Sequence, residues 1–82
     1  MKAEDLLRQA RAANLKGDAP GAYKLAAESY YLTPGADAAK LMVLSACKMG
    51  DATLARRAFG KVKGSARDQV EAVCAHRGVK VQ

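Results

Sequence analysis

The chain has 82 residues, the size of one small domain, and half of them are apolar although only 5% are aromatic. No run reaches the roughly 18 apolar residues that a transmembrane helix needs, and acidic residues near the N-terminus stand where a signal peptide would be apolar. We therefore expect no membrane insertion. Much of the apolar share is alanine, which favours helices, so the composition predicts an all-α fold with close helix contacts.

The net charge of +6 lies mainly in the second half of the chain. Residues 1–47 carry six basic and five acidic side chains, whereas residues 48–82 carry eight and three. A basic surface raises encounter rates with nucleic acid, anionic lipid or an acidic protein. The charge alone leaves these three classes of partner open.

Two helices are expected in the first part of the chain, one over residues 3–16 and one between Asp18 and Thr33. Gly17 can end the first helix in a left-handed conformation, and Asp18 can cap the second, which Thr33-Pro34-Gly35 closes. Apolar and small residues recur at helical spacing on one face of each helix: Leu6, Ala10, Ala13 and Gly17, then Ala22, Leu25, Ala26, Ser29 and Leu32.

Three more helices are expected over residues 36–49, 52–62 and 65–77. Gly64 separates the last two, and Ser65-Ala-Arg-Asp68 resembles a capping box with Asp in place of Glu. Residues 79–81 are too short to predict a strand. The buried stripes of the last two helices are expected to contain Ala55, Ala58, Phe59 and Val62, then Ala66, Val70, Val73 and Cys74.

A short motif recurs at a fixed spacing. "KGDAPGA" at 16–22 returns as "MGDATLA" at 49–55, an offset of 33 residues. Such a period is typical of helical repeats. We predict a single domain over residues 1–82, with two antiparallel helix pairs at about 3–34 and 36–63 and a capping helix at about 65–77. Ala22 and Ala55 are expected to be small because the helices of each pair cross closely just beyond the corner.

The repeated pair resembles the tetratricopeptide repeat. The similar positions are Ala10, Gly17-Asp18, Ala22, Ser29 and Pro34 in the first copy, and Gly50-Asp51, Ala55 and Phe59 in the second. The resemblance implies a right-handed α-α superhelix that binds peptides through the first helix of each pair. The chain departs from the family in having no Trp, in placing Ala13 and Ala46 at the usual aromatic position, and in ending the second copy with Gly64 instead of proline.

The same resemblance implies a set of partner-binding residues. Their cations could bind an acidic peptide or a C-terminal carboxylate, and Asn14 could hydrogen-bond a peptide backbone. The alternative is an ordinary solvated helix face. The residues are Leu7, Arg11, Asn14 and Leu15 from the first helix, and Lys40, Leu44, Cys47 and Lys48 from the third.

Two further segments, "LSACKMGDATLARRAF" and "QVEAVCAHRGV", are similar to the C-terminal tails of myxobacterial-type bacterial serine/threonine protein kinases. In that context the chain would be a non-catalytic appendage, since the glycine-rich loop, HRD and DFG motifs of the kinase are absent. The resemblance implies a signalling role through protein–protein interaction. Taken alone, the chain is expected in the cytoplasm, and it would lie in the periplasm if it follows a membrane span in a longer kinase.

A basic run in the second half offers an alternative function. The run could bind the phosphates of nucleic acid, but its one aromatic residue, Phe59, is assigned to the buried stripe and none is left for base stacking, so nucleic acid is not the expected partner. Its residues are Arg56, Arg57, Lys61, Lys63 and Arg67.

The tyrosines leave another alternative open. Tyr23, Tyr30 and Tyr31 are expected to pack between helices, and the alternative is an exposed patch for homodimerisation, because two repeats are fewer than the three usually needed to bury a continuous core.

The cysteines and the single histidine do not predict a reaction. Cys47, Cys74 and His76 give three ligands where a structural zinc site needs four, so we expect no metal and no cofactor. The favoured interpretation of the cysteines is two half-buried thiols, and the alternative is a disulfide, which requires an oxidising compartment. His76 suits the C-terminal dipole of the last helix, and no catalytic set can be assembled around it, so the chain is not expected to be an enzyme.

Overall fold

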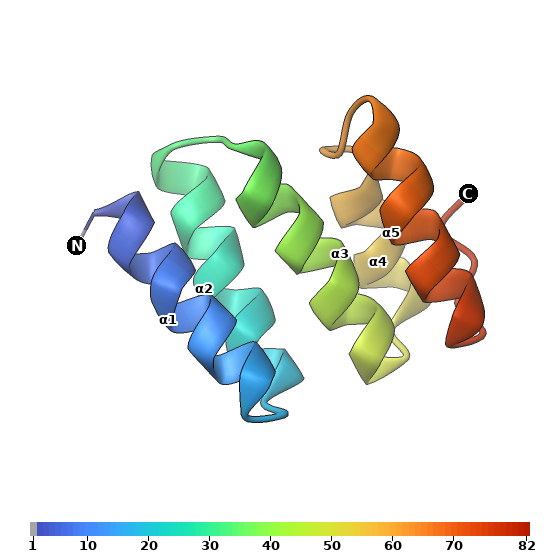
Figure 1. The fold of residues 1–82 in the computed structure, drawn as a ribbon, viewed down its shortest axis with the longest axis horizontal. Coiled ribbons are helices and arrows are strands. Elements are labelled where there is room, and N and C mark those ends of the chain that lie inside the picture. The colour runs from blue at the N-terminus through green and yellow to red at the C-terminus, as the bar shows by residue number, and fades with distance from the viewer. Residues whose placement is uncertain (1) are drawn as a thin grey trace.

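The computed structural model describes residues 2–82, which form five helices and no strand (Figure 1). This confirms the predicted all-α class. The helices are α1 (Ala3–Leu15), α2 (Ala19–Leu32), α3 (Ala36–Met49), α4 (Ala52–Phe59) and α5 (Ser65–His76).

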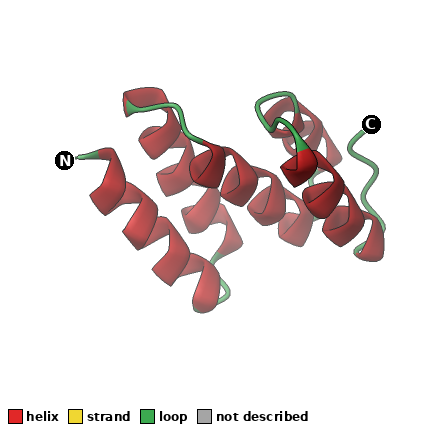
Figure 2. Ribbon diagram, turned by 45° about the horizontal axis from the view of Figure 1, so that its top comes forward, coloured by secondary structure: helices red, strands yellow, loops and turns green. Residues whose placement is uncertain are grey.

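The helices follow one another as an antiparallel series in which α1, α3 and α5 run in the same direction (Figure 1). Helix α2 packs against both α1 and α3, and α3 in turn contacts α4, α5 and α1. The short loops lie at the two ends of this array, and the N- and C-terminal ends lie on opposite sides of the molecule (Figure 2). Helix α3 is therefore the central element of the fold.

The two glycines of the repeated motif end α1 and α3 in the same way. Gly17 has a φ of 84° and Gly50 a φ of 73°, the left-handed conformation that glycine adopts without steric cost. The amide of the next residue donates a hydrogen bond to the carbonyl of Ala13 in α1 (2.9 Å) and of Ala46 in α3 (3.0 Å). Each helix thus closes in a Schellman motif, as the glycine positions predict.

The two aspartates of the motif then start α2 and α4. Asp18 Oδ1 accepts a hydrogen bond from the Gly21 amide, and Asp51 Oδ1 accepts one from the Leu54 amide, both at 3.0 Å. The carboxylates satisfy amides that the first helical turn leaves without a partner. One Gly-Asp pair therefore ends a helix and begins the next one at both corners.

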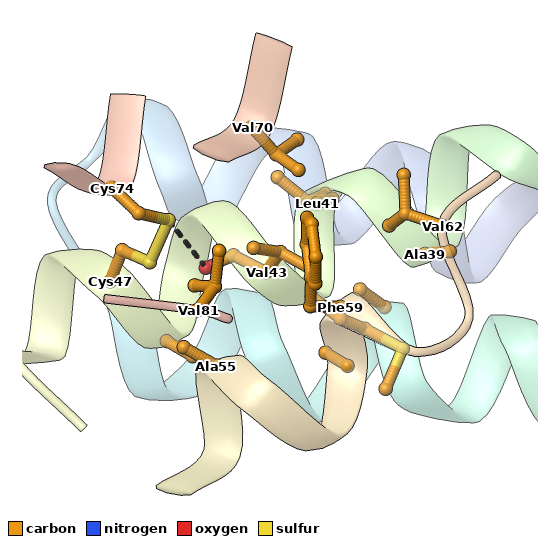
Figure 3. Close-up of a cluster of buried hydrophobic side chains, with 14 of the residues drawn as sticks. Ala39, Leu41, Val43, Cys47, Ala55, Phe59, Val62, Val70, Cys74 and Val81 are labelled. Carbon is orange, nitrogen blue, oxygen red and sulfur yellow. Dashed lines mark hydrogen bonds between the residues drawn. A yellow bond between two sulfur atoms is a disulfide. The ribbon is translucent and has the colours of Figure 1, made fainter. Parts of the chain in front are cut away.

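The core is centred on α3 and extends toward α4 and α5 (Figure 3). Fully buried alanines, among them Ala10, Ala22 and Ala55, let the helices approach closely. Larger buried apolar side chains come mainly from α3 and the chain that follows it: Leu41, Met42, Val43, Phe59, Val62, Val70, Val79 and Val81.

Helix α4 ends three residues before its predicted boundary at Val62. It stops at Phe59, and tighter hydrogen bonds from Lys61 to Ala58 (2.9 Å) and from Val62 to Phe59 (3.0 Å) carry the chain onward. The glycine at position 60 disfavours a longer helix. Val62 is still buried as predicted, because these turns keep it directed into the core.

Two predicted core residues are exposed instead. Leu32 is 58% exposed because it is the last residue of α2 and lies at an open edge beside Lys2 and Glu4. Val73 is 45% exposed because the main helix contact of α5 is with α3, which covers only a narrow stripe.

The predicted capping box at the start of α5 is also wrong. The N-cap residue is Gly64, with a φ of 66°, and no side chain from residues 2–82 caps the helix. The unusual backbone turn at Gly64 places Ser65 inside the first helical turn, where its hydroxyl no longer occupies the capping position.

Candidate functional site

The cations predicted to bind a partner lie along α1 and α3, and two of them already have partners within the chain. Arg11 forms an ion pair of 3.4 Å with Asp37, and the Lys48 ammonium donates a hydrogen bond to Asn14 Oδ1. Both contacts join α1 to α3. Within residues 2–82, Lys40 has no such partner. Because exposed ion pairs contribute little, about 0–1 kcal/mol, a ligand could displace them at small cost.

The apolar residues predicted for the same surface divide into three kinds. Leu7 and Leu44 are half-buried and pack against the core, so only their edges can contact a partner. Leu15 is 87% exposed at the end of α1. Cys47 is buried and cannot contact a partner, which corrects its assignment to this surface. We call the surface formed by Leu7, Arg11, Asn14, Lys40, Leu44 and Lys48 the α1/α3 face.

A shallow depression of about 240 Å³ lies at the N-terminal ends of α1 and α3. Buried Ser29 lies in its wall and donates a hydrogen bond of 2.8 Å to the Ala3 carbonyl, which ties α2 to the start of α1. Glu4 and Asp37 also line the depression. This end of the α1/α3 face is therefore acidic, whereas Lys48 makes the other end basic, because the two helices run in parallel.

The predicted basic run does not form one continuous strip. Arg67 turns inward: its Nη1 atom donates hydrogen bonds to the carbonyls of Val62 (2.9 Å) and Phe59 (3.2 Å), and its guanidinium lies 4.0 Å from the centre of the Phe59 ring. These contacts satisfy carbonyls at the end of α4 and brace the loop to α5. Arg67 is thus a structural residue.

The other four cations of the run spread over α4 and the following loop. The Lys61 ammonium lies 5.9 Å from the centre of the Tyr30 ring, and Arg56, Arg57 and Lys63 are exposed. Lys61 and Lys63 line a shallow depression of about 230 Å³ with Tyr30, Pro34, Gly35 and Ala36.

The tyrosines serve two different roles. Tyr23 and Tyr30 are half-buried and pack against the core, as predicted, whereas Tyr31 is 78% exposed. Burial raises the pKa of Tyr23 above its usual value; Tyr31 and Asp51 add to the rise and Arg57 opposes it. Tyr31 therefore contributes most of the aromatic surface that α2 exposes.

The cysteines form a disulfide that joins α3 to α5. Cys47 and Cys74 have Cα atoms 5.3 Å apart, and both residues are buried. Cys74 Sγ also lies 4.0 Å from the Val43 carbonyl oxygen (Figure 3). The favoured interpretation as two half-buried thiols is therefore wrong, and the structure contains the alternative. Spacing alone could not decide between them, because pairing depends on how α5 packs against α3.

Sequence reasoning missed several buried residues, among them Leu41, Met42, Ser45, Val79 and Val81. Val79 and Val81 follow α5 and are 6% and 4% exposed, although the segment is not a strand. The alternation of valine and polar residues was the available signal. Ser45 is fully buried on α3, and its hydroxyl has no hydrogen-bond partner within residues 2–82.

Metal-ligating clusters and membrane-spanning helices are both absent from residues 2–82. Across residues 2–82, no three His, Cys, Asp or Glu side chains gather in a way that could hold a metal ion. In the same part of the chain, none of the helices has the length and apolar character needed to cross a bilayer.

Comparison of the chain with protein-family models, with curated proteins and with solved structures finds no match.

Proposed function

We propose that the chain is a non-catalytic protein-interaction module of the tetratricopeptide type. The observation that carries this proposal is the duplicated Gly-Asp corner, in which Gly17 and Gly50 adopt the same conformation and Asp18 and Asp51 make the same cap. The corresponding helices of the two pairs, α1 and α3, run in the same direction and contact each other, so they contribute to one face. Repeat proteins of this kind use such faces to bind extended segments.

The charges on the α1/α3 face define the class of ligand. A bound peptide would place a cationic or neutral group near Glu4 and Asp37, and a carboxylate near Lys48. Between these ends, Lys40 adds a cation that has no ion-pair partner among residues 2–82. The ligand is thus an extended protein segment of mixed charge whose acidic end lies toward the C-termini of α1 and α3.

Two alternatives have weaker support. Arg67 could not contribute to a nucleic-acid-binding strip, because its guanidinium already contacts Phe59 and Val62. A structural homodimer would depend on Tyr31, because Tyr23 and Tyr30 pack against the core. Binding of duplex DNA that weakens steeply with salt would favour the first alternative, and association without any ligand would favour the second.

The cellular context is proposed from the kinase-tail resemblance, which would make the module an accessory part of a bacterial signalling kinase. The disulfide bears on its location. A buried Cys47–Cys74 bond supports the periplasm or another oxidising compartment rather than the cytoplasm, where thiols are kept reduced.

A charge-reversal experiment tests the proposed face. Peptides would be selected against the chain from a random display library and their affinities measured by fluorescence anisotropy. We expect Lys40→Glu/Lys48→Glu to weaken the selected peptides by about tenfold or more. The control Arg56→Glu/Lys63→Glu makes the same change of net charge away from the face and should alter affinity by less than about twofold. Equal loss in both variants would indicate nonspecific electrostatic attraction and contradict the proposal.

A further inference from the structure

The segment after α5 lies against the core without helical or strand structure. We call residues 79–82 the tail. Its two valines are almost completely buried, whereas Lys80 and Gln82 are exposed. The Val81 side chain points toward the part of the core that contains Val43, Cys47 and Ala55 (Figure 3). The tail thus covers apolar surface of α3 and α4 that α5 does not cover.

Few interactions hold the tail in place. Gly78 closes α5 with a φ of 81°, and the Val79 amide donates a hydrogen bond of 2.8 Å to the Cys74 carbonyl. Beyond Val79, the backbone of residues 80–82 makes no hydrogen bond to other residues in the described chain. The attachment of this part therefore depends on the side chain of Val81.

The surroundings of the tail are also loosely packed on one side. A depression of about 240 Å³ lies between the tail and α5, lined by Glu71 and Ala75 together with the tail itself. Glu71 and Lys80 line the same depression, so one acidic residue lies near the position between the two valines.

We propose that the tail occupies, within its own chain, a binding site for an extended peptide of the pattern Val-Lys-Val. The site selects side chains, because it makes almost no backbone hydrogen bonds to the tail: two apolar positions accept the valines, and Glu71 favours a cation between them. A segment of a partner protein with this pattern competes with the tail for the site. The site lies over α3, α4 and α5, away from the α1/α3 face, and does not depend on the function proposed for that face.

The test uses the whole chain with the substitutions Val79→Ser and Val81→Ser, which leave the site without its own valines. The probe is the synthetic peptide Arg-Gly-Val-Lys-Val-Gln, added during two-dimensional NMR of the labelled chain. We expect shifts at the amides of Val43, Cys47 and Ala55. A control peptide with serine at both valine positions should bind about tenfold more weakly or not at all, because it cannot bury the apolar side chains.

The unsubstituted chain gives a second comparison. Its own tail competes for the site, so the valine peptide should bind it about tenfold more weakly than it binds the doubly substituted chain. If the double variant loses its native spectrum, Val81→Ser alone provides the same comparison, because it keeps Val79 and the end of α5. Equal binding of the two peptides, or the absence of shifts at Val43, Cys47 and Ala55 in the folded variants, would overturn the proposal.

Discussion

The α1–α2 pair and the α3–α5 region each contain the same Gly-Asp corner but hold their helices with different groups. In α1–α2 the contacts are mainly between small residues such as Ala10, Ala22 and Ala26, with one hydrogen bond from Ser29. The α3–α5 region adds a disulfide, and it buries the larger side chains of the core. The corner thus sets the direction of the helices, whereas the side chains beyond it set how strongly each region is held.

This difference has an energetic reason. Burying an apolar group contributes in proportion to its area, about 0.8 kcal/mol for each CH₂, and alanine offers little area. The first pair therefore depends on docking against α3, while the C-terminal region has its own valines, Phe59 and covalent link. Four sets of substitutions test this contrast.

Removing the disulfide should have the largest effect. Cys47 and Cys74 are separated by 27 residues, and a crosslink closing a loop of this size contributes about 3 kcal/mol by restricting the unfolded chain. We expect Cys47→Ala/Cys74→Ala to lower the free energy of unfolding by about this amount in urea titrations. The loss of protection against hydrogen exchange should be greatest in α5. An unchanged unfolding midpoint would show that the link does not hold the C-terminal region.

Enlarging the corner alanines should have the next largest effect. Ala22→Phe and Ala55→Phe should each cost about 1–3 kcal/mol by overpacking a close helix crossing. Ala55 should be the more sensitive, because it belongs to the main core cluster and Ala22 does not. Exposed Ala12→Phe on α1 is the control for helix propensity. Thermal melts in which both buried variants match the parent would contradict the proposed close crossing.

Weakening the Arg67 contacts should lower the free energy of unfolding by a smaller amount than enlarging the corner alanines. Arg67→Lys keeps the charge but loses the planar guanidinium that bonds two carbonyls and stacks on Phe59, so we expect a loss of about 1 kcal/mol. Exposed Arg56→Lys is the matched control and should change stability by less than about 0.5 kcal/mol. Similar effects of the two changes in urea titrations would show that Arg67 has no special structural role.

Two serines give the smallest expected changes, with opposite signs. The Ser29 hydroxyl bonds the Ala3 carbonyl, so Ser29→Ala should destabilise the chain by about 1 kcal/mol. The Ser45 hydroxyl is buried without a partner in the described residues, so Ser45→Ala should leave stability unchanged or raise it by up to about 1 kcal/mol. Destabilisation by Ser45→Ala equal to that by Ser29→Ala would mean that Ser45 has a bonded partner.

Local signals in the sequence were sufficient for the helices and both corners. The glycines at 17 and 50 need a left-handed conformation, and the aspartates that follow can cap a helix, so neighbouring residues determine the outcome. The end of α4 was less predictable, because it combines a local and a tertiary cause. Gly60 disfavours a longer helix, and the Arg67 guanidinium, eight residues further along, bonds the Phe59 carbonyl.

The arrangement of the candidate site depended on contacts between helices and could be predicted only in part. Placing Arg11 and Lys48 on one face follows from the repeat, but their pairing with Asp37 and Asn14 depends on the distance between α1 and α3. The disulfide and the burial of Val81 likewise depend on how the end of the chain returns to α3. A helical period cannot supply this information, because it describes one helix at a time.

Native-state hydrogen exchange, followed residue by residue by NMR, tests most directly whether two regions built on the same Gly-Asp corner differ in stability. The amide of Ala10 in α1 should exchange through openings of lower free energy than those of Val43 in α3 and Cys74 in α5, with protection at least about tenfold weaker. Equal protection in α1 and α3, or stronger protection in α1, would contradict the account.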